Sequence, residues 1–322
     1  MNSNIPISLR LQMRKRKKRW SRFFTTIFLI VFLLLVIDNF KNSHSSTLVS
    51  PLSVLGVQKD GENNSIKYNS LKEAVEGSLA GSKGEYGVVV KNLKTGETYS
   101  KNENQEFESG SLYKLWVMAE TFNQLEKGII REDDELKESI PGLNREFGID
   151  PEYAEQTSGF INLTVKEALH QMITISHNYS ALSLSKKIKL PSIKSFLEDN
   201  GFEKSEVGTG GDNPVSTPSD ITLFFEKLYK GELVSKEVSE KMLELLKKQE
   251  LNNKLPKKLP ENITVAHKTG EIGWFSHDAG IVYSDKGDYI IVVFSKSDLP
   301  AAAEDRIANL SKSVYEYFKE KD

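Results

Sequence analysis

Two serine–lysine pairs in this chain have a spacing that permits acyl-transfer chemistry. Ser111 stands three residues before Lys114, and Ser183 stands three residues before Lys186. Residues three apart share one face of a helix, so each lysine lies within reach of its serine. A lysine can take the proton of a serine hydroxyl if burial or a nearby positive charge lowers the lysine pKa. A serine and a lysine at this spacing are more often a helix cap and a solvated side chain than a catalytic pair. The apolar run 115–118 would bury the stem of Lys114, however, and therefore favours the first pair.

Two later motifs supply further hydroxyl, amide and amine groups. The sequence Ser-His-Asn at 176–178 interrupts a predicted helical region, and Lys-Thr-Gly at 268–270 ends a predicted strand. Two lysines that converge on one serine repel each other, so at least one of them loses its proton more easily. A phosphate-binding loop does not explain the last motif, because His267 takes the place of the required glycine and no helix follows. An ordinary helix break and a solvated strand end are the structural alternatives for the two motifs.

The elements that must position these motifs are strands near both ends of the chain and helices between them. Strands are predicted at 86–92, 98–100, 263–267, 279–283 and 289–294, with turn residues inside each hairpin. Helices are predicted at 70–79, 111–127, 164–175, 178–190, 217–230, 236–248 and 300–318, and several begin with a capping pattern. No convincing hairpin is present between 128 and 249.

This order predicts an α+β domain. A lone hairpin is marginally stable in water, so the early strands are expected to pair with the late ones in one antiparallel sheet. Helices would flank that sheet, and the segment between its two halves would form an all-helical subdomain. We expect a cleft where the sheet meets the subdomain, with the motifs gathered in it.

Composition limits the range of functions. The chain has 322 residues, a formal net charge of −2 and no cysteine. The lack of cysteine excludes disulfides, thiolate metal sites and a cysteine nucleophile. A net charge this close to zero provides no overall basic field, so no nucleic-acid partner is expected. No His-Glu-x-x-His pattern is present, and we expect neither a metal nor a cofactor.

The first 69 residues predict a membrane anchor. Residues 1–22 are basic and would stay in the cytoplasm, whereas 23–40 are mostly apolar. The apolar run is short for a span of about 20 residues, but Trp20 and Phe40 can lie at the two interfaces. Because small residues suited to cleavage do not follow, we favour an uncleaved signal-anchor over a signal peptide. The polar segment 41–69 would be a tether, and 70–322 the extracellular domain of a single-pass protein of the cell membrane.

The three motifs, in this order and on these kinds of element, resemble the signature of the penicillin-recognising serine enzymes, which form the β-lactamase and D,D-peptidase superfamily. The resemblance is strongest to the class A β-lactamase-like family. The resemblance covers roughly 70–322. It implies that Ser111 is the nucleophile of an acyl-enzyme and that Lys114 accepts or relays its proton. It also implies that Ser176 bridges Lys114 and Lys268 and passes a proton to the leaving nitrogen, and that Lys268 lowers the pKa of Lys114.

The same resemblance assigns the residues that bind substrate. Asn178 would hold the amide side chain of the substrate, and Lys268 and Thr269, followed by Gly270, would bind its carboxylate. The backbone N–H groups of Ser111 and Glu271 would form an oxyanion hole, in which one donor is worth about 3 kcal/mol.

The chain departs from the family pattern at three places. His177 stands where aspartate is common, and it is either a group that titrates near neutral pH or a structural residue. The loop 199–216 lacks the Glu-x-x-Leu-Asn motif whose glutamate activates the deacylating water in class A enzymes. Its stretch 206–214 offers only Glu206 and Asp212 as acids. Glu271 stands where a small residue is usual and adds a negative charge beside the expected anion site. We therefore expect acylation, followed by slow deacylation.

Two functions agree with these motifs. The first is a membrane-anchored extracytoplasmic serine hydrolase that acts on β-lactams or peptidoglycan peptides, with β-lactamase-like activity favoured over D,D-peptidase-like activity. The second is a non-hydrolytic sensor or pseudoenzyme on the same fold, which binds penicillin or peptidoglycan without turnover.

Overall fold

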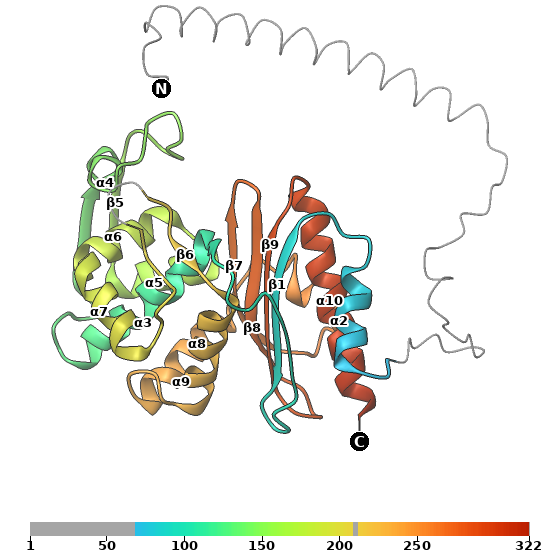
Figure 1. The fold of residues 1–322 in the computed structure, drawn as a ribbon. Coiled ribbons are helices and arrows are strands. Elements are labelled where there is room, and N and C mark those ends of the chain that lie inside the picture. Colours follow the sequence, from blue (N-terminus) through green and yellow to red (C-terminus); the bar gives the residue numbers. More distant parts are fainter. Residues whose placement is uncertain (1–67, 209–211, 322) are drawn as a thin grey trace, which may run out of the picture. The chain divides into compact units, whose positions relative to one another are not determined.

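The residues that the computed structural model describes, 68–208 and 212–321, are organised around a five-stranded antiparallel sheet (Figure 1). Its strands stand in the order β2-β1-β9-β8-β7. They span β1 (Glu85–Asn92), β2 (Thr98–Lys101), β7 (Val265–Ile272), β8 (Phe275–Val282) and β9 (Tyr289–Lys296). β1 pairs with β9 along its whole length, from Glu85 opposite Lys296 to Asn92 opposite Tyr289. The predicted pairing of early strands with late ones is therefore confirmed.

Both faces of this sheet are buried, because apolar residues fill consecutive positions of its central strands. Side chains alternate between the two faces of a strand, so β9 sends Tyr289, Ile291 and Val293 into one apolar cluster. The neighbouring Ile290, Val292 and Phe294 enter another. The helices α2 (Leu71–Leu79) and α10 (Pro300–Glu320) cover the first face, and α8 (Pro218–Lys230) packs on the second (Figure 1).

A helical subdomain continues from the second face. It contains α3 (Lys114–Glu126), α5 (Val165–Thr174), α6 (Asn178–Ile188) and α9 (Lys236–Leu246), all near their predicted positions. Thr164 and Thr217 cap α5 and α8 as the sequence predicts, through hydrogen bonds to backbone N–H groups three residues later. Trp116 is fully buried at the centre of the subdomain, with its ring 4.8 Å from that of Phe202. This packing fixes the start of α3, on which Lys114 lies.

Four short strands that the sequence does not predict lie within and beside the helical subdomain. β4 (Glu135–Ser139) pairs with β5 (Phe160–Thr164), with the short helix α4 (Ile140–Glu146) between them. β3 (Phe107–Glu108) pairs with β6 (Val215–Ser216). These short strands bury few side chains and are joined by long connections, so neither an apolar alternation nor a tight turn marks them in the sequence.

A further helix, α7 (Leu190–Asn200), follows α6 where the sequence analysis expects none. Lys189 has a φ of 70° and turns the chain between the two helices. Pro191 lies in the first turn of α7, where its missing N–H leaves no intrahelical hydrogen bond unmade. The proline therefore starts a new helix and does not only end the preceding one.

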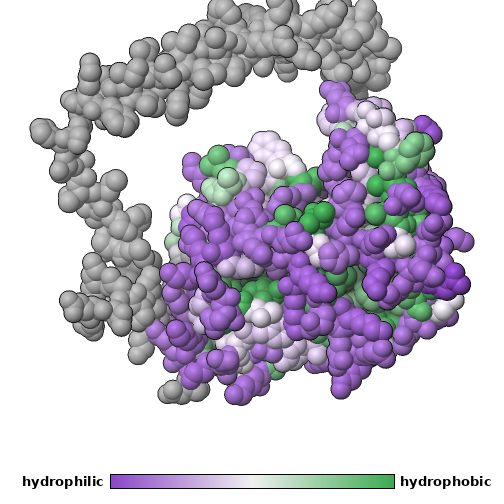
Figure 2. Space-filling view, turned by 180° about the vertical axis from the view of Figure 1, so that it is seen from behind, coloured by the Kyte–Doolittle hydropathy of each residue, from purple (hydrophilic) through white to green (hydrophobic). Residues whose placement is uncertain are grey.

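The face shown in Figure 2 is mainly hydrophilic, with apolar residues in small separate patches. Within 68–208 and 212–321, none of the helices has the length and apolar character needed to cross a membrane. The basic segment 1–22, the predicted anchor 23–40 and the tether up to residue 67 lie outside the described residues.

Candidate active site

Ser111 lies on a 3₁₀ turn, Gly110–Tyr113, that runs directly into α3. The turn packs against β7 so closely that two glycines are required. A Cβ atom on Gly270 would lie 2.6 Å from the carbonyl oxygen of Ser109, and one on Gly110 would lie 2.7 Å from the backbone nitrogen of Glu271. Gly110 also has a φ of +48°, in the left-handed region that side chains disfavour. These contacts place Ser111 beside the backbone of Glu271.

The strand that leads into this turn is anchored on both sides. The backbone N–H of Ser109 donates to the carbonyl of Pro214 over 2.8 Å. His277 Nε2 donates to the carbonyl of Glu108 over 2.8 Å, and its Nδ1 accepts from the backbone N–H of Ser295 over 3.0 Å. Burial lowers the pKa of His277 to about 4, so the ring stays neutral and keeps both hydrogen bonds. This histidine is structural.

Lys114 is fully buried, as the apolar run after it predicts. Its Nζ donates to the carbonyl of Ser176 over 2.5 Å, to the hydroxyl of Ser176 over 3.2 Å and to Oδ1 of Asn178 over 2.6 Å. Among the described residues, the hydroxyl of Ser111 makes no hydrogen bond of its own to either lysine. Hydrogen bonds in an active site often tighten only when substrate is bound. Lys114 lies one helical turn after Ser111, and the motif at 176–178 sets the orientation of its amine.

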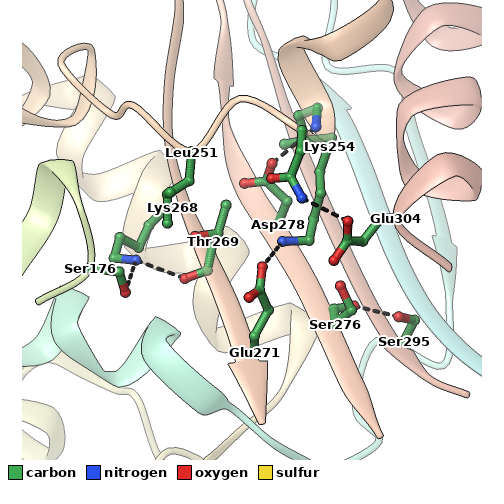
Figure 3. Close-up of polar contacts among 12 residues, drawn as sticks. Ser176, Leu251, Lys254, Lys268, Thr269, Glu271, Ser276, Asp278, Ser295 and Glu304 are labelled. Atoms are coloured by element: carbon green, nitrogen blue, oxygen red, sulfur yellow. Dashed lines mark hydrogen bonds and ion pairs between the residues drawn. The ribbon is translucent and has the colours of Figure 1, made fainter. Parts of the chain in front are cut away.

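Ser176 joins the two lysines. Lys268 Nζ donates to its hydroxyl over 3.0 Å and to the carbonyl of Thr269 over 2.8 Å, as Figure 3 shows. The same hydroxyl accepts from Lys114. Ser176 has a φ of 58°, an uncommon conformation for a residue with a side chain and one that clusters at functional sites. Ser176 lies 65 residues after Ser111 and 92 residues before Lys268 in the sequence, yet polar atoms of all three motifs meet here.

The two amines lose their protons more easily than ordinary lysines. Burial lowers the pKa of Lys114 to about 7, and the negative charge of Glu155 partly opposes this effect. Burial also lowers the pKa of Lys268 well below its usual value, and the positive charge of Lys114 adds to the shift. Burial is the main cause at both lysines. The charge of Lys114 adds to the shift at Lys268, but the expected lowering of the Lys114 pKa by Lys268 is not confirmed, because burial is what lowers it.

His177 caps a helix. Its Nδ1 accepts from the backbone N–H of Ser180 over 3.1 Å at the start of α6. Burial, and then the charge of Lys114, lower the pKa of His177, so the ring is neutral near pH 7 and Nδ1 can accept. Aspartate also accepts well at this position of a helix. The exchange of aspartate for histidine therefore keeps the cap, and of the two interpretations of His177 the structural one is supported.

Asn178 orients its amide between a cation and an anion. Its Oδ1 faces Lys114, and its Nδ2 donates to Oε1 of Glu155 over 2.5 Å. Glu155 lies in the connection between α4 and β5 and has no motif around it, so the sequence does not mark it as a site residue.

Glu271 does not leave an unbalanced negative charge in the site. Its carboxylate pairs with the ammonium of Lys254, which reaches it from the loop before β7 (Figure 3). Lys254 is fully buried, whereas the side chain of Glu271 is 53% exposed. Lys254 stands 17 residues from Glu271 in the sequence, and no local pattern predicts the pair.

The second serine–lysine pair is not part of this site. Ser183 is buried in α6, and Lys186 forms ion pairs with Glu138 and Glu146 over 2.7 and 3.1 Å. These carboxylates raise the pKa of Lys186, so it is a poor proton acceptor. The three motifs built around Ser111 are the ones that converge.

The comparisons with known proteins agree with this arrangement. A model of the beta-lactamase enzyme family matches residues 70–318. Beta-lactamase CARB-4 of Pseudomonas aeruginosa is 24% identical over 272 residues, which cover 79% of this chain and 92% of that protein. The structure of PBP-A has a TM-score of 0.68 at 22% identity and covers 79% of this chain and 98% of its own. The TLA-1 extended-spectrum beta-lactamase has a TM-score of 0.66 at 23% identity, with 77% and 97% covered.

The structural similarities concern the fold, and the family match extends over the whole domain that carries the three motifs. The resemblance inferred from those motifs is thereby confirmed: the chain belongs to the beta-lactamase enzyme family.

Proposed function

We propose that this protein is a serine hydrolase that β-lactams acylate on Ser111. One observation carries the proposal: the hydroxyl of Ser176 accepts hydrogen bonds from both Lys114 and Lys268, so a path for protons joins the two amines. Family membership supports the same chemistry. A variant of PBP-A, a protein with the same fold, has been solved as an acyl-enzyme complex with penicillin G.

The proposed reaction begins with the neutral amine of Lys114. It removes the proton of Ser111 while Oγ bonds to the β-lactam carbonyl carbon, and the negative oxygen that forms is held by the N–H groups of Ser111 and Glu271. The bond from that carbon to the ring nitrogen then breaks. The nitrogen receives its proton from Ser176, which is resupplied by Lys114. Lys268 and Thr269, with Gly270, bind the carboxylate of the substrate.

Deacylation is proposed to be slow. Glu206 is exposed, pairs through its backbone with Val215, and lines a cavity of about 320 Å³ against α7. Asp212 is exposed as well. Neither acid is among the hydrogen-bond partners of Ser176 or the two lysines. This arrangement also favours the second candidate, a penicillin- or peptidoglycan-binding sensor that keeps its acyl group. D,D-peptidase-like action on peptidoglycan peptides is a further possibility within the first candidate.

We also propose that residues 23–40 anchor the protein in the cell membrane, with 1–22 in the cytoplasm and the domain outside. The support is the sequence pattern of a basic segment followed by an apolar one. Protease added to intact cells should digest the domain and leave the N-terminal segment protected.

Two probes applied in parallel test the proposed chemistry. A chromogenic cephalosporin reports turnover, and a fluorescent penicillin reports a covalent adduct on a denaturing gel. Turnover supports the hydrolase, and a stable stoichiometric adduct supports the sensor. The variant Ser111→Ala should lose the adduct, whereas Ser183→Ala, which removes the serine of the other pair, should keep it. Labelling of a folded Ser111→Ala variant contradicts the proposal.

A further inference from the structure

The carboxylate of Glu155 accepts a hydrogen bond from the amide N–H₂ of Asn178. In the proposed function that group holds the amide side chain of the substrate, and the present inference rests on that proposal. The hydrogen bond from Asn178 Nδ2 to Glu155 Oε1 measures 2.5 Å. Because the opposite end of the same amide accepts from Lys114 over 2.6 Å, Asn178 cannot turn its N–H₂ elsewhere without losing that bond. Glu155 accepts one of the two N–H groups of Nδ2, so a substrate amide held by the other lies beside its carboxylate.

Glu155 is held beside α6 by its neighbour in the chain. The hydroxyl of Tyr179 donates to the carbonyl of Gln156 over 2.8 Å, and the amide of Asn144 donates to the same carbonyl over 2.8 Å. Tyr179 is buried and directly follows Asn178. The segment that carries Glu155 is thus fixed to the same helix as the amide it contacts, and the carboxylate stays at the edge of the site.

The charge of Glu155 is not neutralised by an ion pair. No salt bridge among the described residues includes it, and its side chain is exposed. Lys114 contacts the opposite end of the Asn178 amide, and burial lowers the pKa of that lysine to about 7. A negative charge therefore faces any group that approaches Asn178 from the solvent.

We propose that Glu155 determines specificity, and that the site prefers substrates with a cationic group next to the amide that Asn178 holds. Such a cation forms an ion pair with Glu155. A neutral group gains no ion pair there, and an anionic group is repelled by the carboxylate.

Three penicillins that differ at one carbon atom test the proposal. Benzylpenicillin is neutral there, ampicillin carries an amino group and carbenicillin a carboxylate. The full-length protein in detergent is treated with each of them near pH 6.5, where an α-amine is largely protonated. Fluorescent penicillin then labels the sites that remain, and the time course gives the rate of acylation. The variants are Glu155→Gln and, as a control with the same loss of charge in the same segment, Glu152→Gln.

Ampicillin should acylate the native protein roughly 1.4 to 5 times faster than benzylpenicillin, which corresponds to the ~0.2–1 kcal/mol that an exposed ion pair contributes. Carbenicillin should be slower by a similar factor. The differences in acylation rate among the three penicillins should become smaller in Glu155→Gln and at high salt, which screens exposed charges. They should persist in Glu152→Gln.

The outcomes separate this inference from the proposed function. Acylation by all three penicillins at ratios that Glu155→Gln does not change overturns the inference alone. An equal loss of preference in Glu152→Gln overturns it too, because the general charge of the segment would then be responsible. Absence of any adduct in the native protein overturns the proposed function, and the inference with it.

Discussion

Acylation of Ser111 should depend steeply on pH, because Lys114 accepts a proton only when its amine is neutral. With a pKa of about 7, roughly half of the lysine is neutral at pH 7, and roughly 1% at pH 5. The rate of acylation should therefore fall by roughly 100-fold between pH 9 and pH 5, with a midpoint near 7. Stopped-flow measurement with a fluorescent penicillin gives this rate, and circular dichroism at each pH shows whether the protein remains folded.

Two variants test whether Lys114 is the residue responsible. Lys114→Met should be acylated slowly at every pH, without the midpoint. Glu155→Gln should move the midpoint to lower pH, because the charge of Glu155 opposes the effect of burial on the pKa of Lys114. A flat profile between pH 5 and 9 in the native protein, or a midpoint near that of an ordinary lysine, would refute the assignment of Lys114 as the proton acceptor.

The same pKa affects stability in a direction that can be worked out. Folding lowers the pKa of Lys114 from 10.5 to about 7, so between these values the folded protein binds fewer protons than the unfolded chain. Stability from this group must then rise with pH across that window, by at most about 1.4 kcal/mol per pH unit. Urea unfolding at pH 7 and pH 9 should show a smaller gain in Lys114→Met than in the native protein. An equal gain in both would contradict the linkage.

Three further changes have expected outcomes. Ser176→Ala removes the acceptor shared by the two lysines and should lower the acylation rate about 100-fold in protein that circular dichroism shows to be folded; a rate near that of the native protein would exclude a role for the bridge. Gly270→Ala places a methyl group against the 3₁₀ turn of Ser111 and should also reduce the acylation rate about 100-fold. An unchanged rate would show that the position of this turn is not critical. Glu271→Gln leaves the buried Lys254 without its partner and should cost about 2 kcal/mol in urea unfolding, less than for a fully buried pair because Glu271 is half exposed. The double variant with Lys254→Met should recover much of that loss, and a purely additive effect of the two changes would argue against the pair.

The sequence predicts the parts of this fold that local patterns encode. The β1 and β9 strands are runs of apolar, mostly β-branched residues, and Thr164 and Thr217 mark helix starts by capping. Three motifs in a fixed order predicted which residues form the candidate site, and the convergence of Lys114 and Lys268 on Ser176 agrees with that prediction.

What the sequence did not predict depends on contacts between distant residues. The ion pair of Lys254 with Glu271 and the contact of Asn178 with Glu155 join residues whose neighbours have no recurring pattern. The pKa of Lys114 depends on how deeply α3 is buried, which only the packed structure defines. The charge balance around a site is thus harder to predict than its reacting groups.

The strand order of the sheet determines when during synthesis this protein can become functional. β1 lies between β2 and β9, and β9 begins almost 200 residues after β1 ends. A nascent chain that has been synthesised only as far as the 3₁₀ turn of Ser111 still lacks β9, so one side of β1 has no partner strand. It also lacks Lys268 on β7. Contacts this far apart in sequence form slowly. An incomplete chain therefore exposes an open strand edge that invites aggregation, and it gains its chemistry only after the last strands have been made.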